Sequence, residues 1–316
     1  MNAAEPTVEQ FPDPLIAYIA ATRPPFILAT VMPIFLGLAY SFYEGHTLHA
    51  LNAMLTLLAG ILLHAATNVL NDYYDSLNGS DALNEERIFP FTGGSRFIQN
   101  EVLSRKQVLL YGIGLVLAVM LVGAYLISQA GVSLFWLGLF GLLLGWGYSA
   151  PPLSLNSRGL GEISVLAGFS LLPLGTFLVQ TGDISTTLLL VSLPVGLLTA
   201  NLLYINQFPD RKADIQAHKL HWVARLAPRV SRWGYVLIAG LAWLVLGGLI
   251  AVGILPTLAI ISALPAVLSI RAACILLPNA ERPQALAPAI QMTILAMLSH
   301  GALLSMALVI TALLRG

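Results

Sequence analysis

One stretch of the sequence places Asn and Asp side chains at helical spacing. It holds Asn68, Asp72 and Asp75, followed beyond a glycine by Asp81. At about 100° per residue, the first three side chains project within about 60° of one another, so one helical face would present an amide and two carboxylates. Hard oxygen ligands of this kind are those that Mg²⁺ prefers, above all when it also binds phosphate oxygens.

A second stretch repeats this chemistry. It holds Asn206, Asp210 and Asp214, and Pro209, which has no backbone N–H, is predicted to end or kink the helix just before Asp210. A single Asp near a helix end is more often a solvated charge, but two sets at helical spacing favour metal ligation. The predicted Mg²⁺ ligands are Asn68, Asp72, Asp75, Asp81, Asn206, Asp210 and Asp214, of which Asp72, Asp75, Asp210 and Asp214 are the predicted catalytic carboxylates.

The elements that carry these residues are predicted to be membrane spans. Of 316 residues, 57% are hydrophobic and only 9% are charged, whereas soluble domains carry about 25% charged residues. A helix crosses about 30 Å of hydrocarbon with roughly 20 residues. Hydropathy therefore predicts an all-α polytopic membrane protein with nine transmembrane helices, at 24–43, 49–71, 108–129, 132–149, 160–181, 185–206, 233–253, 255–275 and 288–313.

The basic residues set the expected orientation. With nine spans, every Lys and Arg except Arg315 falls on one face of the membrane. By the positive-inside rule that face is cytoplasmic, which predicts a multi-pass protein of the cell inner (cytoplasmic) membrane with its amino terminus inside and its carboxyl terminus on the opposite side. The formal net charge is zero, so nothing suggests a nucleic-acid partner.

The two Asp-bearing stretches stand four spans apart, at the ends of the second and sixth spans. This spacing predicts a single membrane domain over 1–316, built from two pseudo-repeat halves at about 14–149 and 150–275 and a last helix at 288–313. Such a duplication would bring two equivalent loops together over a central cavity of a single helix bundle.

The two motifs resemble the signature motifs of the UbiA superfamily of membrane prenyltransferases. Further stretches, among them Arg23-Pro24 and the runs at 71–75, 159–162 and 175–182, are similar to the branch that prenylates 1,4-dihydroxy-2-naphthoate in menaquinone synthesis. The resemblance implies a nine-helix bundle capped by two Asp-rich loops. It also implies Mg²⁺-dependent transfer of an isoprenoid chain from a polyprenyl diphosphate to an aromatic acceptor.

The second motif departs from this branch. Pro209 stands where the branch usually has Arg, and Lys212 where it has an acidic residue, while Asp210, Asp214 and Lys219 keep the expected spacing. Binding of Mg²⁺ and the diphosphate is therefore expected to be intact. The identity of the acceptor stays open, with 4-hydroxybenzoate as the alternative.

Other polar side chains near the motifs are candidate substrate contacts. For Arg96, Lys212 and Lys219 we expect contact with phosphate, although inside-facing topogenic charge explains such cations equally well. Arg23 and Arg158 are candidates for pairing with an acceptor carboxylate. The candidates for stabilising an allylic cation or positioning the acceptor are Tyr148, Asn201 and Tyr204, against the alternative that the tyrosines belong to an interfacial belt.

A function of another class is a secondary transporter, which also has repeats and intramembrane carboxylates. That reading predicts charges near the middle of spans, whereas the acidic residues here stand at one end of two spans. His64 and His300 are predicted to be hydrogen-bonded packing residues, because Mg²⁺ prefers oxygen ligands.

Overall fold

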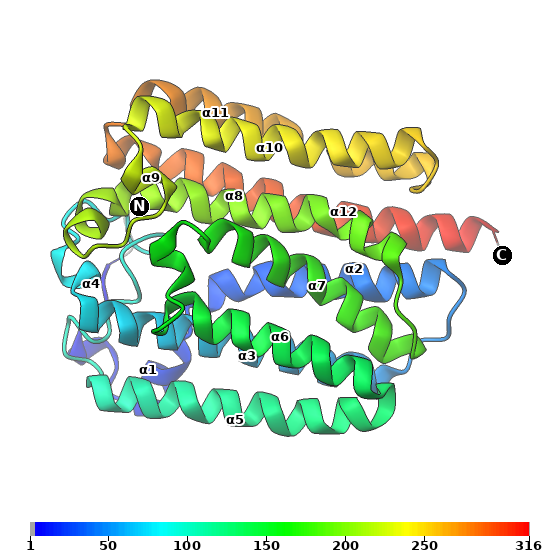
Figure 1. The fold of residues 1–316 in the computed structure, drawn as a ribbon, viewed down its shortest axis with the longest axis horizontal. Coiled ribbons are helices and arrows are strands. Elements are labelled where there is room, and N and C mark those ends of the chain that lie inside the picture. Colours follow the sequence, from blue (N-terminus) through cyan, green and yellow to red (C-terminus); the bar gives the residue numbers. More distant parts are fainter. Residues whose placement is uncertain (1–3, 316) are drawn as a thin grey trace.

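The computed structural model describes residues 4–315, and within this range the chain is all helical, with no strand. The long helices run side by side in one bundle, with the short helices α1, α4 and α9 at one end (Figure 1). In chain order the elements are η1 (Val8–Gln10), α1 (Pro14–Ala21), α2 (Pro24–Tyr43), α3 (Ala50–Asn78), α4 (Ser80–Leu83), α5 (Arg105–Ala130), α6 (Val132–Ser149), η2 (Leu155–Arg158), α7 (Gly161–Thr181), α8 (Thr186–Gln216), α9 (Trp222–Arg225), α10 (Pro228–Ala251), η3 (Thr257–Ala263), α11 (Ala266–Asn279), η4 (Pro283–Leu286) and α12 (Ala287–Arg315).

Nine helical segments of the described chain are long and apolar enough to cross a membrane, as predicted. Two of them extend by about two turns or more beyond the ends that hydropathy suggested. The segment expected at 49–71 is helical to Asn78, and the one expected at 185–206 is helical to Gln216. Hydropathy ends a span where polar residues begin, but these polar residues continue the helix and place their side chains in the interior of one end of the bundle.

Of the two outcomes predicted for Pro209, an end of the second motif's helix is wrong, and a kink stays a prediction. α8 continues through Pro209 for two further turns, with Pro209 itself buried. A proline inside a helix leaves one carbonyl without its partner, but such prolines are tolerated in membrane helices because surrounding groups satisfy the freed carbonyl. Asp210 and Asp214 therefore lie on successive turns of one helix.

Local sequence signals fix where several helices begin or end. Gly79 has a φ of +86°, in the left-handed region, so it ends α3 and turns the chain directly into α4. Ser104 caps α5 through a capping box with Gln107, and Ser185 caps α8 by accepting a hydrogen bond from the Leu188 N–H.

The packing of the helices makes α8 the central element. It contacts α7, α10 and α12, and most of its length is buried. α2 packs between α3, α7 and α12, and α3 packs against α5 and α6. In Figure 1, α4 and α9 lie together at one end of the bundle, opposite the end that carries the carboxyl terminus. The polar ends of α3 and α8 therefore meet at the same end.

Candidate functional site

A polar cavity of about 200 Å³ lies at this end of the bundle, where α3, α4 and α8 meet the loops that follow them. Both Asp-rich motifs contribute to its walls. Of the predicted residues, those that line it are Arg23, Asn68, Asp75, Asp81, Tyr148, Asn206, Asp210, Asp214 and Lys219.

Lys219 joins the two motifs. Its ammonium lies 3.1 Å from Asp75 Oδ2 on α3 and 3.3 Å from Asp214 Oδ1 on α8. Burial by itself lowers the pKa of Lys219, but the carboxylates of Asp214 and Asp75 outweigh it and raise that pKa well above its ordinary value. The side chain therefore stays charged, as a cation between one carboxylate from each motif.

Asp72 is held away from the cavity by Arg23. The Arg23 guanidinium donates to Asp72 Oδ1, and the Ser95 N–H lies 3.3 Å from each carboxylate oxygen. Arg23 has a φ of 56° immediately before α2, so its backbone takes a left-handed conformation that turns it toward α3. The guanidinium thus covers Asp72, which does not line the cavity, and Arg23 itself forms part of the cavity wall.

Asn84 makes a second link between the two halves of the site. Its Nδ2 donates to Asp210 Oδ1 at 2.6 Å, so the loop after α4 is tied to the end of α8. Two amide oxygens in the cavity wall, Asn84 Oδ1 and Asn206 Oδ1, are buried and have no hydrogen-bond partner. Buried oxygens without a partner are costly unless a cation or donor satisfies them.

Asp81 lies opposite a glycine loop. A Cβ on Gly94, which has a φ of +75°, would lie 2.5 Å from Asp81 Oδ2, so only glycine leaves room for this carboxylate. Burial, together with the nearby carboxylates of Asp75 and Asp72, raises the pKa of Asp81 well above its ordinary value. A cation bound beside these carboxylates would relieve their mutual repulsion.

The donor set fits Mg²⁺, although the arrangement is not that of a preformed cage. Among the described residues, no group of three or more His, Cys, Asp and Glu side chains converges closely enough to hold an ion. The carboxylates are instead kept apart by Arg23 and Lys219. The oxygens available are carboxylates and unpartnered amides, which are hard ligands that suit Mg²⁺ bound jointly by protein and phosphate.

Several predicted contacts lie outside the polar cavity. Lys212 is exposed and pairs with Glu86, and Arg158 is exposed and donates to the Pro152 carbonyl. The buried Arg96 donates to the Asp81 carbonyl and lies 3.6 Å from Glu5. The predicted contacts on α8 that do not line the cavity are Asn201, which is fully buried, and Tyr204, whose hydroxyl donates to the Ser231 carbonyl at 2.6 Å.

Asn84 and His221 are among the cavity residues that were not predicted from the sequence. Asn84 stands in a loop with no helical spacing to mark it. His221 lies two residues after Lys219, and this nearness to the second motif is the one signal that singles it out. The histidines that were predicted to be packing residues do make hydrogen bonds: His64 Nδ1 lies 2.6 Å from Thr30 Oγ1, and His300 Nδ1 lies 2.9 Å from the Ser262 carbonyl.

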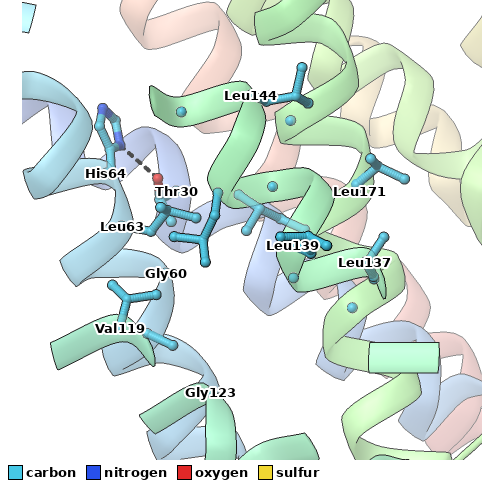
Figure 2. Close-up of a pocket in the computed structure, with 18 of the residues that line it drawn as sticks. Thr30, Gly60, Leu63, His64, Val119, Gly123, Leu137, Leu139, Leu144 and Leu171 are labelled. Atoms are coloured by element: carbon cyan, nitrogen blue, oxygen red, sulfur yellow. Dashed lines mark hydrogen bonds between the residues drawn. The ribbon is translucent and has the colours of Figure 1, made fainter. Parts of the chain in front are cut away.

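A second, larger cavity of about 630 Å³ adjoins the first and is almost entirely apolar. Figure 2 shows Gly60, Leu63 and Val119 of α3 and α5 on one side of it, and Leu139 and Leu171 of α6 and α7 on the other. The residues that line both cavities are His64, Thr67, Asn68, Tyr148, Val165 and Phe169. The site thus joins a polar, anionic chamber to a long apolar one.

Comparison with known proteins agrees with this architecture. The profile of the UbiA prenyltransferase family matches residues 30–313. A 1,4-dihydroxy-2-naphthoate octaprenyltransferase of Haemophilus influenzae is 32% identical over 228 residues, which are 70% of this chain and 72% of that protein. A 2-carboxy-1,4-naphthoquinone phytyltransferase of Synechocystis is 30% identical over 257 residues, 78% of this chain and 79% of that protein.

The fold is also that of a solved structure, a UbiA homolog from Archaeoglobus fulgidus bound to DMAPP and Mg²⁺. It is 17% identical, with a TM-score of 0.64, and the match covers 91% of this chain and 99% of that chain. With a family match over most of its length and a relative above 30% identity, this chain belongs to the UbiA prenyltransferase family and is a multi-pass membrane transferase.

Proposed function

We propose that this enzyme transfers a polyprenyl chain from its diphosphate to 1,4-dihydroxy-2-naphthoate, the acceptor of a menaquinone pathway. The observation that carries the proposal is the junction of the two cavities, where an anionic, oxygen-rich chamber opens onto an apolar one. A prenyl diphosphate has a charged head, which suits the polar cavity, and a hydrocarbon tail, which suits the apolar cavity. The names of the relatives in Haemophilus influenzae and Synechocystis support a naphthalene-based acceptor.

In this proposal the polar cavity binds the diphosphate together with Mg²⁺. The proposed ligands are the two motifs named from the sequence, with Asp75, Asp81, Asp210 and Asp214 in the cavity wall and Asp72 just behind Arg23. Magnesium supplies Lewis-acid stabilisation of the charge that develops on the departing diphosphate. The Lys219 ammonium contacts the carboxylates of Asp75 and Asp214. In the proposal, one of these contacts is replaced by a contact between the ammonium and a phosphate oxygen.

The chain's own residues then control the fate of the allylic group. When the bond from the first prenyl carbon to oxygen breaks, its electron pair leaves with the diphosphate, and the allylic cation is left at the junction. Phe169 and Tyr148 line this junction and offer ring faces toward a cation. The apolar cavity excludes water, so the cation bonds a ring carbon of the acceptor instead of being hydrolysed. That carbon then loses its proton, or its carboxylate as CO₂, which restores the aromatic ring.

The identity of the acceptor is proposed from the names of the relatives. Acceptor contacts proposed from the sequence were Arg23 and Arg158, and only Arg23 lines the cavity. A smaller ring such as 4-hydroxybenzoate is the alternative acceptor. The transporter reading is set aside, because the family is one of transferases.

We further propose that the polar cavity opens on the cytoplasmic side of the inner membrane. Except for Arg271, which lies within α11, and Arg315, the described Lys and Arg residues lie in or beside the connections at the end of the bundle where α4 and α9 lie, and this excess of positive charge is typical of a cytoplasmic face. The diphosphate head would then enter from the cytoplasm, while the prenyl tail enters from the bilayer.

The test is prenyl transfer in isolated membranes with labelled farnesyl or geranylgeranyl diphosphate, Mg²⁺ and a panel of acceptors. We expect a prenylated naphthalene product and its loss on removal of Mg²⁺. Asp75→Asn and Asp210→Asn are each expected to lower the rate by roughly 100-fold or more, because a ligand charge is removed where charge develops. Asp183→Asn, an exposed carboxylate at the far end of the bundle, is the control.

Two results would change the proposed assignment. Product formed with 4-hydroxybenzoate and not with the naphthoate would move the assignment to the smaller acceptor. Wild-type rates in both Asp75→Asn and Asp210→Asn would contradict the metal site itself.

A further inference from the structure

We infer that His221 is a positioning residue of the diphosphate site, which holds the carboxylate of Asp214 in a fixed orientation by tying it to the start of α9. The inference rests on the proposed function, because it assigns a role toward the metal and diphosphate that this site is proposed to bind. Neither the sequence motif nor the family match assigns a role to this histidine.

The two ring nitrogens of His221 have different partners. Nδ1 accepts a hydrogen bond from the Ala224 N–H at 3.1 Å, which makes His221 the N-cap of α9. An accepting nitrogen carries no proton, so the proton of the neutral ring is on Nε2. Nε2 lies 3.0 Å from Asp214 Oδ2 and therefore donates to it. One imidazole thus satisfies a helix terminus on one edge and a carboxylate on the other.

The backbone that carries this ring is itself fixed. The Lys219 N–H donates to the Asp214 carbonyl at 2.8 Å, and the Leu220 N–H donates to the Ser157 carbonyl at 2.9 Å. The ring is 2% exposed and forms part of the wall of the polar cavity. His221 is therefore a rigid support and not a surface residue that happens to face an acid.

Asp214 is held through both of its oxygens, but the two contacts differ. Lys219 contacts Oδ1 and shares its charge with Asp75, so this contact is the one that a phosphate or a metal ion can replace. His221 contacts Oδ2 and, among residues 4–315, no other carboxylate. The histidine therefore keeps Asp214 in place when Lys219 moves, and leaves Oδ1 directed at the cavity. A support of this kind is how outer residues orient metal ligands.

Capping alone does not account for a histidine here. Ser, Thr, Asp and Asn are the preferred N-cap residues, and each reaches the helix amides as well as an imidazole does. Their side chains carry no second group on the opposite edge that would reach Asp214. A histidine at this position is explained by its two contacts, one with the α9 backbone and one with the Asp214 carboxylate.

Two substitutions separate the two halves of this bridge. His221→Asn keeps an acceptor at the position of Nδ1 and so retains the cap, but loses the contact with Asp214. His221→Gln reaches the position of Nε2 and retains a donor to Asp214, but loses the cap. Ser185→Ala is the matched control, because it removes an N-cap from α8 at the far end of the bundle.

The measurements are the midpoint of thermal unfolding of each purified full-length protein without divalent ions, its rise on adding Mg²⁺, and the Mg²⁺ concentration that half-activates prenyl transfer. For His221→Asn we expect a midpoint near that of the wild type, a smaller rise with Mg²⁺, and an activation constant about tenfold higher or more. For His221→Gln and Ser185→Ala we expect a lower midpoint with a wild-type response to Mg²⁺.

A wild-type response of His221→Asn to Mg²⁺ would overturn the inference and reduce His221 to a helix cap. So would loss of the Mg²⁺ response in His221→Gln while its folded state persists. Failure of the proposed function looks different, since the wild-type protein would then show neither a rise in its unfolding midpoint with Mg²⁺ nor Mg²⁺-dependent transfer.

Discussion

At the scale of single residues, the polar cavity is organised by cations that stand between carboxylates. Arg23 pairs with Asp72, and Lys219 contacts Asp75 and Asp214 at once. The carboxylates are buried and the two cations are mostly covered, with 20% of the Arg23 side chain and 13% of the Lys219 side chain exposed. Each charge therefore depends on its partners more than a charge in a surface ion pair does. The cationic side chains set the spacing of the acidic ones, and a diphosphate with Mg²⁺ would have to replace these contacts.

Lys219→Met therefore should destabilise the protein when no divalent ion is present. The substitution keeps the length of the side chain but leaves two buried carboxylates without their cation, at an expected cost of about 3 kcal/mol. Lys212→Met removes an exposed cation, with 71% of its side chain accessible, and should cost less than about 1 kcal/mol. Thermal unfolding of both variants in detergent checks this, and equal losses would contradict a bridging role for Lys219.

At the scale of elements, the site depends on helices that continue past the apolar part of their spans. α3 runs to Asn78 and α8 to Gln216, so the second motif and all of the first motif except Asp81 lie on the turns of these two helices. Asp81 lies in α4, beyond Gly79. The glycine loop that includes Gly94 then covers these ends. Its left-handed backbone brings the loop against Asp81 more closely than any side chain would allow.

Gly94→Ala should impair diphosphate binding as well as stability. The left-handed conformation alone costs an alanine roughly 1 kcal/mol, and the added Cβ would also push against the Asp81 carboxylate. Gly45→Ala is the matched control, because Gly45 has a φ of +87° and nothing lies within 4 Å of an added Cβ. Gly45→Ala should lose only the stability that the backbone conformation costs, and Gly94→Ala should lose more because of the added contact with Asp81. Only Gly94→Ala should show a raised KM for the diphosphate. A raised KM in Gly45→Ala as well would rule out the local contact as the cause.

At the scale of the whole molecule, the bundle separates a charged end from an apolar body. The polar cavity and the short helices α4 and α9 occupy one end, and the carboxyl terminus lies at the other (Figure 1). The apolar cavity lies between α3, α5, α6 and α7. A substrate that is half ion and half hydrocarbon fits this division.

Cysteine labelling tests the proposed orientation. After replacement of Cys274, the one cysteine of the chain, single cysteines are introduced at Lys106 and at Asp183, both exposed and at opposite ends of the bundle. In intact cells, a membrane-impermeant maleimide should label Asp183→Cys and not Lys106→Cys, because the basic end is proposed to face the cytoplasm. The reverse pattern would place the polar cavity on the outer side.

The sequence by itself determined the features that depend on local pattern. Nine spans follow from hydropathy, and the two motifs follow from helical spacing, since both signals lie within about 20 consecutive residues. The sequence also showed which oxygen-bearing side chains are available as proposed ligands. The two pseudo-repeat halves remain a prediction.

Only the tertiary structure decided which charged groups meet. Arg23 and Asp72 are 49 positions apart, and Lys219 and Asp75 are 144 apart, so no local pattern connects them. Lys212 was expected in the site beside Asp210 and Asp214, yet it projects outward, because its place on the same helix turns it to another face. Asn84 and His221 enter the cavity through loops whose path depends on the packing of α8 against its neighbours. Side-chain partners over such separations are fixed by the folded bundle, in which burial makes an unpaired charge too costly to persist.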